Sequence, residues 1–236
     1  MATISVGRID EQPFFQPWIG DQYAAKLKRV ANGDLNNGGL HRVHLMAESH
    51  YSDESPSPDW TKSAVQKLAL EKNPDGAFWT KAIQVVEKKP AEELDRQQAW
   101  HDVAYSNFIQ QPLSQARQAP TDEMWEEGRR CFFAQLAITR PTVLVVLGKR
   151  LFAQLPNEGV RVPWTLQMRP EWAAVSDAWL YPWINNGGLE LTLAVSVAHP
   201  SGRGSQQVRA ERAWGALCFY SNIAMAFEQG QFGELA

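Results

Sequence analysis

The sequence predicts an α/β fold, specifically a three-layer α/β/α sandwich with a short, mainly parallel central sheet and an antiparallel hairpin strand. Two observations predict it. Aliphatic and β-branched runs, typical of strands buried on both faces, alternate along the chain with helical patterns. A tight-turn signal, residues 185–188, directly precedes the last of these runs and indicates a hairpin.

The chain of 236 residues has the length of one α/β domain, so we expect a single domain over residues 1–236, with residues 1–40 as an N-terminal wrap. Its charged content of 21% is that of a soluble globular protein, and its net charge of −3 excludes an overall basic field. The cysteines, Cys131 and Cys218, lack metal spacing, so we expect reduced thiols in a cytoplasmic protein. We expect no membrane partner, because no apolar run reaches transmembrane length.

The first half of the chain carries two strand patterns among helices. The run HRVHLMA predicts a strand over 41–47, and the short run VAYSNF predicts another over 103–108. Hydrophobic residues recur on one face between Phe78 and Lys88, where Pro90 ends the helix. The helices expected in this half cover residues 21–30, 60–70, 78–88 and 91–100.

The second half continues the alternation. Thr121 is a hydroxyl N-cap with acids after it, which predicts a helix over 122–138. The run TVLVVL at 142–147 is typical of a central parallel strand, and Gly148 permits a tight exit. The remaining elements expected are a helix that begins within 149–155, strands over 161–166 and 178–184, a strand from Leu189, and a helix over 205–228.

Polar side chains follow three of the predicted strands. The loops at 48–54, 107–112 and 199–204 should meet at one edge, because the carboxyl ends of parallel strands share it and ligands bind there. Glu48 is suited to orient water or stabilise positive charge, Asn107 to present an amide to a planar ligand, and His199 to stabilise a leaving anion. Each also has a structural interpretation as a loop or turn residue that bonds to the backbone.

Other chemistries lack their motifs. The segment Gly148–Arg150 has no glycine-rich loop before it, which argues against nucleotide triphosphate hydrolysis, and no Gly-x-Ser-x-Gly elbow occurs. His41, His44 and His50 fit no common metal spacing, and strand alternation separates the first two. We therefore expect no metal and no cofactor.

Four segments, in the same order along the chain, resemble the uracil-DNA glycosylase superfamily. LMAESHY resembles the first motif, which reads Gly-Glu-Ala-Pro-Gly in the iron–sulfur branch and Gly-Gln-Asp-Pro-Tyr-His in the best-known branch. AYSNFI resembles the strand that ends in a base-reading asparagine. Residues 119–147 resemble the helix-Arg-Pro-strand-Gly block of the iron–sulfur branch. His-Pro-Ser matches the last motif. The segments are 45–51, 104–109, 119–147 and 199–201, within a resemblance that covers about residues 42–212 with long unmatched stretches.

The resemblance implies hydrolysis of the N-glycosidic bond of uracil, or a related deaminated base, flipped out of single- or double-stranded DNA. Glu48 and His199 would be catalytic: Glu48 would position water or stabilise the cationic sugar, and His199 would donate to the departing base. The base would be read by Asn107. The resemblance further implies base-binding roles for Tyr51, which would wall the pocket against the methyl of thymine, for Phe78, which would stack, and for Ser49, and DNA contacts through Ser201, Arg203 and Arg209. We expect a monomer.

The sequence departs from the family at informative positions. Ser49 replaces the water-activating aspartate of the best-known branch, and His50 replaces a proline. Of the cluster cysteines in the iron–sulfur branch only Cys131 has a match, so we predict no iron–sulfur cluster. Two alternatives stay open: a catalytically weak or inactive member that binds a base or nucleotide, and a hydrolase of a different N-glycoside, such as a free nucleoside.

Overall fold

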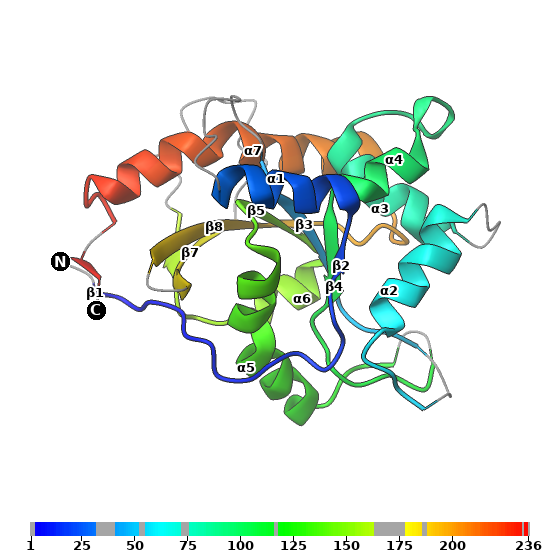
Figure 1. Ribbon diagram of the computed structural model, residues 1–236, viewed down its shortest axis with the longest axis horizontal. Coiled ribbons are helices and arrows are strands. Elements are labelled where there is room, and N and C mark those ends of the chain that lie inside the picture. Colours follow the sequence, from blue (N-terminus) through cyan, green and yellow to red (C-terminus); the bar gives the residue numbers. More distant parts are fainter. Residues whose placement is uncertain are drawn as a thin grey trace.

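The computed structural model describes residues 3–31, 41–51, 55–71, 76–115, 118–162, 178–185, 188–232 and 234–235. Within these residues the fold is α/β, and its centre is a seven-stranded mixed sheet in the order β2-β4-β3-β5-β8-β7-β6 (Figure 1). The predicted α/β class is therefore confirmed.

The middle of this sheet is parallel. Its strands are β4 (Ala104–Asn107), β3 (Val43–Ala47), β5 (Val143–Leu147) and β8 (Gly188–Val197). Ala47 pairs with Asn107 across β3 and β4, and Leu147 pairs with Val197 across β5 and β8. The parallel register thus brings the carboxyl ends of these strands to one edge of the sheet.

The two ends of the sheet are antiparallel. The predicted hairpin is present: β7 (Ala178–Asn185) pairs with β8 along its whole length. At the opposite end β2 (Trp18–Ile19) pairs with β4, so part of the predicted N-terminal wrap adds a short edge strand. Of the strand predicted over 161–166, β6 (Val160–Arg161) holds the first residue, and residues 163–166 lie outside the described part of the chain.

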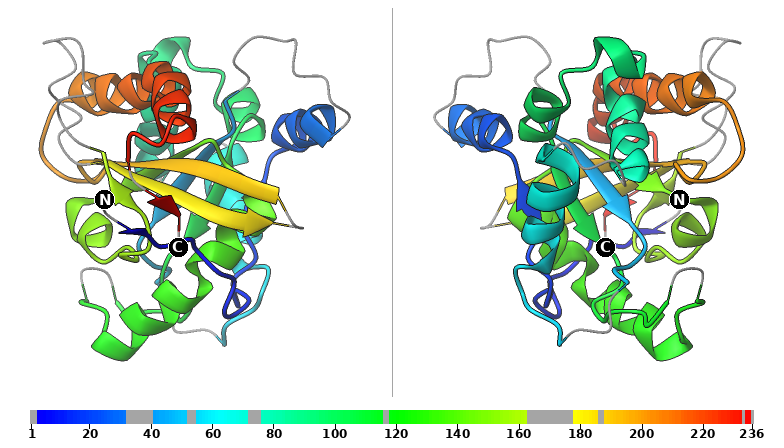
Figure 2. Two further views of the ribbon diagram at one scale, coloured as in Figure 1. Left: turned by 90° about the vertical axis from the view of Figure 1, so that its left-hand side faces the viewer. Right: turned by 90° about the vertical axis from the view of Figure 1, so that its right-hand side faces the viewer.

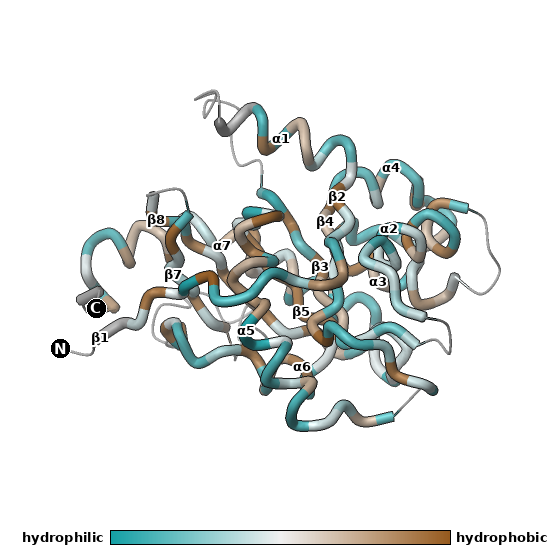
Figure 3. The backbone as a smooth tube through the Cα atoms, turned by 60° about the horizontal axis from the view of Figure 1, so that its bottom comes forward, coloured by the Kyte–Doolittle hydropathy of each residue, from teal (hydrophilic) through white to brown (hydrophobic). Residues whose placement is uncertain are grey.

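Five helices agree with the prediction to within a few residues at each end. Thr121 caps one of them as expected, because its hydroxyl accepts a hydrogen bond from the backbone N–H of Met124. Figure 3 shows hydrophilic and hydrophobic residues alternating along α1, as in an amphipathic helix. These helices are α1 (Asp21–Ala31), α3 (Ala77–Glu87), α5 (Asp122–Thr139), α6 (Lys149–Ala153) and α7 (Gln206–Glu228).

Two predicted helices are wrong in detail. The helix expected over 60–70 is α2 (Trp60–Ala64) followed by a π-helical segment, Val65–Leu70. The helix expected over 91–100 is a single 3₁₀ turn, Ala91–Glu93, and then α4 (Arg96–His101). The Asp95 carboxylate accepts a hydrogen bond from the backbone N–H of Gln98. This N-cap begins a second helical segment, whereas the continuous periodicity had predicted a single unbroken helix.

Side-chain alternation along the strands divides the core in two. Val143, Val145 and Leu147 of β5 belong to one hydrophobic cluster, together with residues of α3, α4 and α7. Leu144 and Val146 belong to a second cluster, with residues of α5 and α6. Figure 2 shows α7 and α5 on different sides of the strands. Burial on both faces explains the continuous hydrophobic runs of the central strands.

Candidate active site

A cavity of about 350 Å³ opens at the carboxyl edge of the parallel strands. It is lined by six of the nine predicted site residues, namely Glu48, Ser49, Tyr51, Phe78, His199 and Ser201. Asn107, Arg203 and Arg209 are not among its lining residues. Its other walls are Ala47, His50, Ala64, Leu68, Trp79 and Tyr105, none of which was predicted as a site residue.

His199 is held as a neutral donor. The backbone N–H of Ser201 donates to its Nδ1 at 3.2 Å, so the proton of the neutral imidazole belongs on Nε2. Burial lowers the pKa of His199 below its ordinary value; Glu48 raises it, while Arg209 and Arg150 lower it further. A neutral histidine with a fixed Nε2–H can donate a hydrogen bond to an acceptor in the cavity.

Arg209 holds the loop that carries His199. Its side chain is buried, with 3% of the residue exposed, and its guanidinium donates to the carbonyls of Ala198 at 2.9 Å, Gly202 at 2.9 Å and His199 at 3.1 Å. The guanidinium N–H groups of Arg209 are therefore hydrogen-bonded to carbonyls inside the protein. Phosphate contact, the role that the resemblance implied, does not fit this geometry, and Arg209 instead positions the loop.

Glu48 follows β3 directly, and Arg150 of α6 binds its carboxylate. The Arg150 Nε donates to Oε2 at 2.9 Å, and an Nη2 contact to Oε1 makes the pair bidentate. The Glu48 side chain is 12% exposed and that of Arg150 is 53% exposed. Sequence reasoning missed this partner, because the two residues lie 102 positions apart.

Phe78 forms an apolar part of the cavity wall beside His199. The Phe78 ring centroid is 5.5 Å from that of His199, at an interplanar angle of 30°, so the two rings form a continuous surface. Tyr51 is 49% exposed, and its backbone bridges to Leu113. The Ser49 hydroxyl is buried without a hydrogen-bond partner among the described residues, which marks a polar group available to a ligand. Residues 52–54 of the predicted loop lie outside the described residues.

Asn107 lies deeper than expected. It is 1% exposed, and its side chain is engaged by neighbours: Nδ2 contacts His50 Nε2 at 2.8 Å, and Oδ1 accepts from the Tyr105 hydroxyl at 3.4 Å. The strand end therefore brings Asn107 toward the cavity, but His50 and Tyr105 lie on the cavity wall in its place.

The surface beside the site carries exposed cations. Lys149 and Arg150 begin α6, and Arg203 lies in the loop after His199. Arg203 and Ser201, for which the resemblance implied DNA contacts, are exposed. Attraction of a phosphate backbone requires such exposed cations.

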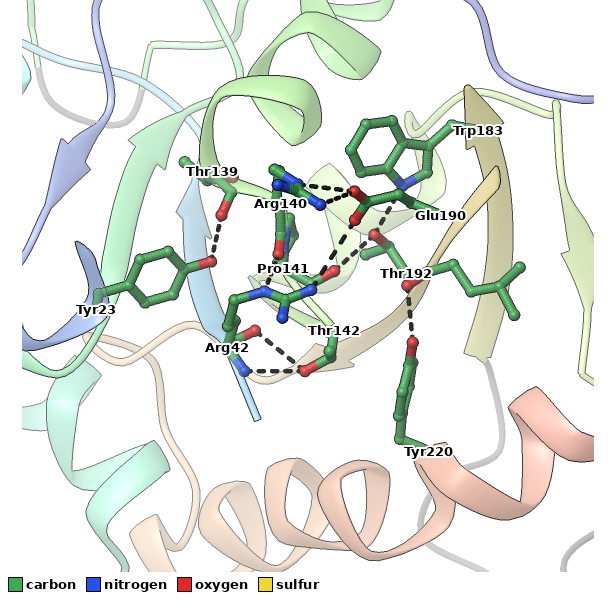
Figure 4. Close-up of polar contacts among 11 residues, drawn as sticks. Tyr23, Arg42, Thr139, Arg140, Pro141, Thr142, Trp183, Glu190, Thr192 and Tyr220 are labelled. Atoms are coloured by element: carbon green, nitrogen blue, oxygen red, sulfur yellow. Dashed lines mark hydrogen bonds and ion pairs between the residues drawn. The ribbon is translucent and has the colours of Figure 1, made fainter. Parts of the chain in front are cut away.

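A separate polar cluster lies at the amino ends of β3 and β5 (Figure 4), and none of its labelled residues lines the cavity. Arg140 Nε donates to Glu190 at 2.7 Å, and Arg42 Nε donates to the Arg140 carbonyl at 2.5 Å. Trp183 Nε1 donates to the Thr192 hydroxyl at 3.0 Å. These contacts join the end of α5 to β3 and the start of β8, so the cluster is structural.

No group of three His, Cys, Asp or Glu side chains among the described residues could hold a metal ion. Cys131 and Cys218 are free thiols, and burial raises the pKa of Cys131 to about 11. No helix in the described part of the chain is long and apolar enough to cross a bilayer.

The sequence matches no model of a known protein family, and no curated protein is significantly similar to it.

Proposed function

We propose that this protein hydrolyses the N-glycosidic bond of uracil, or of a related deaminated base, in DNA. The observation that carries the proposal is the neutral His199, whose Nε2–H is the free donor of a ring that lines the same cavity as Glu48 and Phe78. Such a cavity offers a stacking surface, a hydrogen-bond donor and a carboxylate, which are the groups that this reaction needs.

In the reaction a water oxygen forms a bond to the anomeric carbon of the sugar while the bond from that carbon to the base nitrogen breaks. The electron pair of the broken bond goes to the base, and one water proton finally resides on the released base. Negative charge therefore develops on the base carbonyls, where the His199 Nε2–H can stabilise it. Positive charge develops on the sugar, where the Glu48 carboxylate can stabilise it or orient the water.

The base would stack on Phe78, whose ring extends that of His199. Tyr51, at the exposed end of the cavity, would limit the space available to a 5-methyl group. Arg203, with Lys149 and Arg150, would contact phosphates, and Ser201 would contribute through its exposed backbone and hydroxyl.

We further propose a three-layer α/β/α arrangement, which is supported by the two separate hydrophobic clusters of the strands. The single domain, the monomer and the cytoplasmic location stay predictions.

The test is cleavage of oligonucleotides that contain one uracil, scored as abasic sites after alkaline treatment. Glu48→Gln and His199→Leu should each lower the single-turnover rate by on the order of 100-fold, because each removes a group aimed at developing charge. His41→Gln, which changes a histidine at the amino edge of β3, is the matched control and should cleave normally. Absence of cleavage by the unmodified protein on single- and double-stranded uracil substrates would refute the proposal.

One observation favours a second candidate, a base-binding protein without hydrolysis. Both oxygens of Glu48 are engaged by Arg150, which leaves the carboxylate less able to activate water. In that case free uracil should perturb the NMR signals of His199 and Phe78, while the uracil oligonucleotide remains intact.

A further inference from the structure

The side chain of Asn107 is committed to protein partners on both sides. The Tyr105 hydroxyl donates to Oδ1, which leaves Nδ2 to donate to His50 Nε2 at 2.8 Å. The residue is 1% exposed and is absent from the residues that line the cavity. These contacts use one hydrogen of Nδ2 and one lone pair of Oδ1, and the burial of Asn107 outside the cavity lining keeps its remaining donor and acceptor from direct contact with a base in the cavity.

The engagement of Asn107 fixes the tautomer of His50. His50 Nε2 lies 2.8 Å from Asn107 Nδ2, which has only hydrogens to give, and 2.9 Å from the Thr61 hydroxyl, which can also donate. Nε2 is therefore the accepting nitrogen, and the proton of the neutral ring lies on Nδ1. Burial lowers the pKa of His50 to about 4, so the ring stays neutral at pH 7. Phe15, whose ring centroid is 4.9 Å away, packs against the edge of the imidazole.

Both hydrogen bonds of the His50 ring to described residues are made by Nε2, which leaves Nδ1–H as its further donor, and His50 is one of the residues that line the cavity. Two further donors line the same cavity: the Nε2–H of His199 and the buried, unpartnered hydroxyl of Ser49. The acid of the lining, Glu48, is engaged by Arg150. The neutral rings of His50 and His199 can therefore each present a donor to a ligand, and the Ser49 hydroxyl can donate as well.

Deamination changes the base in the direction that such donors recognise. It replaces the amino group of cytosine or adenine by a carbonyl oxygen, which gives uracil or hypoxanthine. A fixed donor bonds to the carbonyl of the deaminated base. In cytosine or adenine the same donor would face an amino group, which is itself a donor, and this is unfavourable when both are buried. A donor alone does not distinguish a pyrimidine from a purine, and a cavity of about 350 Å³ lies within the range of small-molecule sites.

We propose that His50 is the residue that selects the base, through its Nδ1–H, and that Asn107 is a positioning residue that fixes the tautomer of His50. The substrate class is then the products of deamination of cytosine and adenine, in which a carbonyl oxygen replaces the amino group, so hypoxanthine is a substrate as well as uracil. This proposal rests on the proposed glycosylase function for its substrates, but the roles of His50 and Asn107 can be tested without turnover.

The activity test compares oligonucleotides with one uracil, hypoxanthine, cytosine or adenine at the same position. The unmodified protein should cleave the first two and leave the others intact. His50→Phe keeps an aromatic ring against Phe15 but lacks the donor, so it should cleave uracil and hypoxanthine on the order of 100-fold more slowly. Asn107→Leu should slow both reactions, and His41→Gln is the control that should not.

The spectroscopic test is a long-range ¹H–¹⁵N correlation spectrum of the histidine rings at pH 7, which distinguishes the two neutral tautomers. His50 should show the Nδ1–H form in the unmodified protein and a mixture in Asn107→Leu, while His41 is unchanged. Circular dichroism and thermal unfolding establish that each variant is folded. A variant that does not fold is replaced by His50→Leu or Asn107→Ala, which also lack the donor in question.

The outcomes separate the two proposals. Loss of cleavage in Asn107→Leu with normal rates in His50→Phe would mean that Asn107 reads the base itself, which overturns the role of His50. Cleavage of uracil but not of hypoxanthine would overturn the substrate class. If the unmodified protein cleaves neither base, the glycosylase function fails, and the tautomer spectrum alone decides the positioning role: an Nε2–H form of His50 would overturn it.

Discussion

Replacement of His44 by leucine should make folding markedly less sensitive to acid. His44 is fully buried in β3, where Nε2 lies 2.8 Å from the Ser106 hydroxyl and Nδ1 lies 3.0 Å from the Thr139 hydroxyl. Burial lowers the pKa of His44 to about 3. The two hydroxyls retain Gln135 as a partner when the imidazole is removed, so leucine leaves neither of them without a hydrogen bond.

The magnitude follows from proton linkage. The unfolded chain binds a proton at His44 near pH 6.5, whereas the folded chain does so only near pH 3. The stability due to neutral His44 is therefore fully present above pH 6.5 and is lost as the pH falls toward 3. Between pH 7 and pH 5 this loss is about 2 kcal/mol, and His50, with a folded pKa of about 4, loses about 2 kcal/mol in the same interval.

The assay is urea unfolding at pH 7 and at pH 5. His44 and His50 together should contribute about 4 kcal/mol to the fall in the free energy of unfolding of the unmodified protein between these values, and the fall in His44→Leu should be about 2 kcal/mol smaller. Val145→Ala, a core variant of β5 that does not titrate, should be less stable at both pH values and show the same fall as the unmodified protein. An equal fall in His44→Leu and in the unmodified protein would refute the assignment of His44 as a neutral buried ring.

Three further predictions concern packing and the loop after β8. Phe132→Ala should lower the free energy of unfolding by about 3–5 kcal/mol, because the ring is fully buried and contacts Tyr181 at a centroid distance of 5.1 Å; a urea-measured loss below 1 kcal/mol would contradict this. Gly20→Ala should cost about 1–3 kcal/mol, since its Cβ would lie 2.2 Å from the His101 carbonyl oxygen, and unchanged thermal stability would argue against that close approach. Arg209→Met should cost about 2–3 kcal/mol and increase proteolysis at residues 199–204, because the loop carbonyls lose a charged donor; equal cleavage rates would mean that other contacts hold the loop.

The parts of the fold that the sequence predicted are those whose signals are local. The run at β5, Val143–Leu147, is buried on both faces, so its hydrophobicity is continuous along the sequence. The start of α5 is set by the Thr121 cap, which sequence alone identifies. The edge strand β2 has only two residues, Trp18 and Ile19, and exists because β4 offers its free edge. No periodic pattern fits in two residues, so such strands were missed.

The candidate site was predictable to the level of strand ends and no further. Parallel pairing guarantees that the residues after β3 and β8 approach one another, and this places Glu48 and His199 at one cavity. Which way a side chain turns depends on partners distant in sequence. His50 is hydrogen-bonded to Asn107, which lies 57 positions away in the sequence, and no sequence pattern predicts that contact.

Charge alone was the least informative signal. Arg203 and Arg209 lie six positions apart, and the resemblance implied DNA contact for both. In the structure Arg203 is exposed, whereas Arg209 is buried among the carbonyls of its own loop. Arg203 lies in the loop itself, whereas Arg209 lies in the first turn of α7, which begins at Gln206, and from there its guanidinium reaches the loop carbonyls.

The two arginines that hold the site also set its electrostatics. Arg150 binds Glu48, and Arg209 binds the carbonyl of His199, so each fixes the position of one proposed catalytic group. Both cations lower the pKa of His199, in the same direction as its burial, and oppose the effect of Glu48. If Glu48 dominated, the imidazole would be drawn toward the charged form and its Nδ1 would no longer accept from Ser201. Burial, aided by the two guanidinium groups, therefore allows a carboxylate and a neutral imidazole donor to share one cavity. The proposed hydrolysis needs this combination, because charges of opposite sign develop on the base and the sugar.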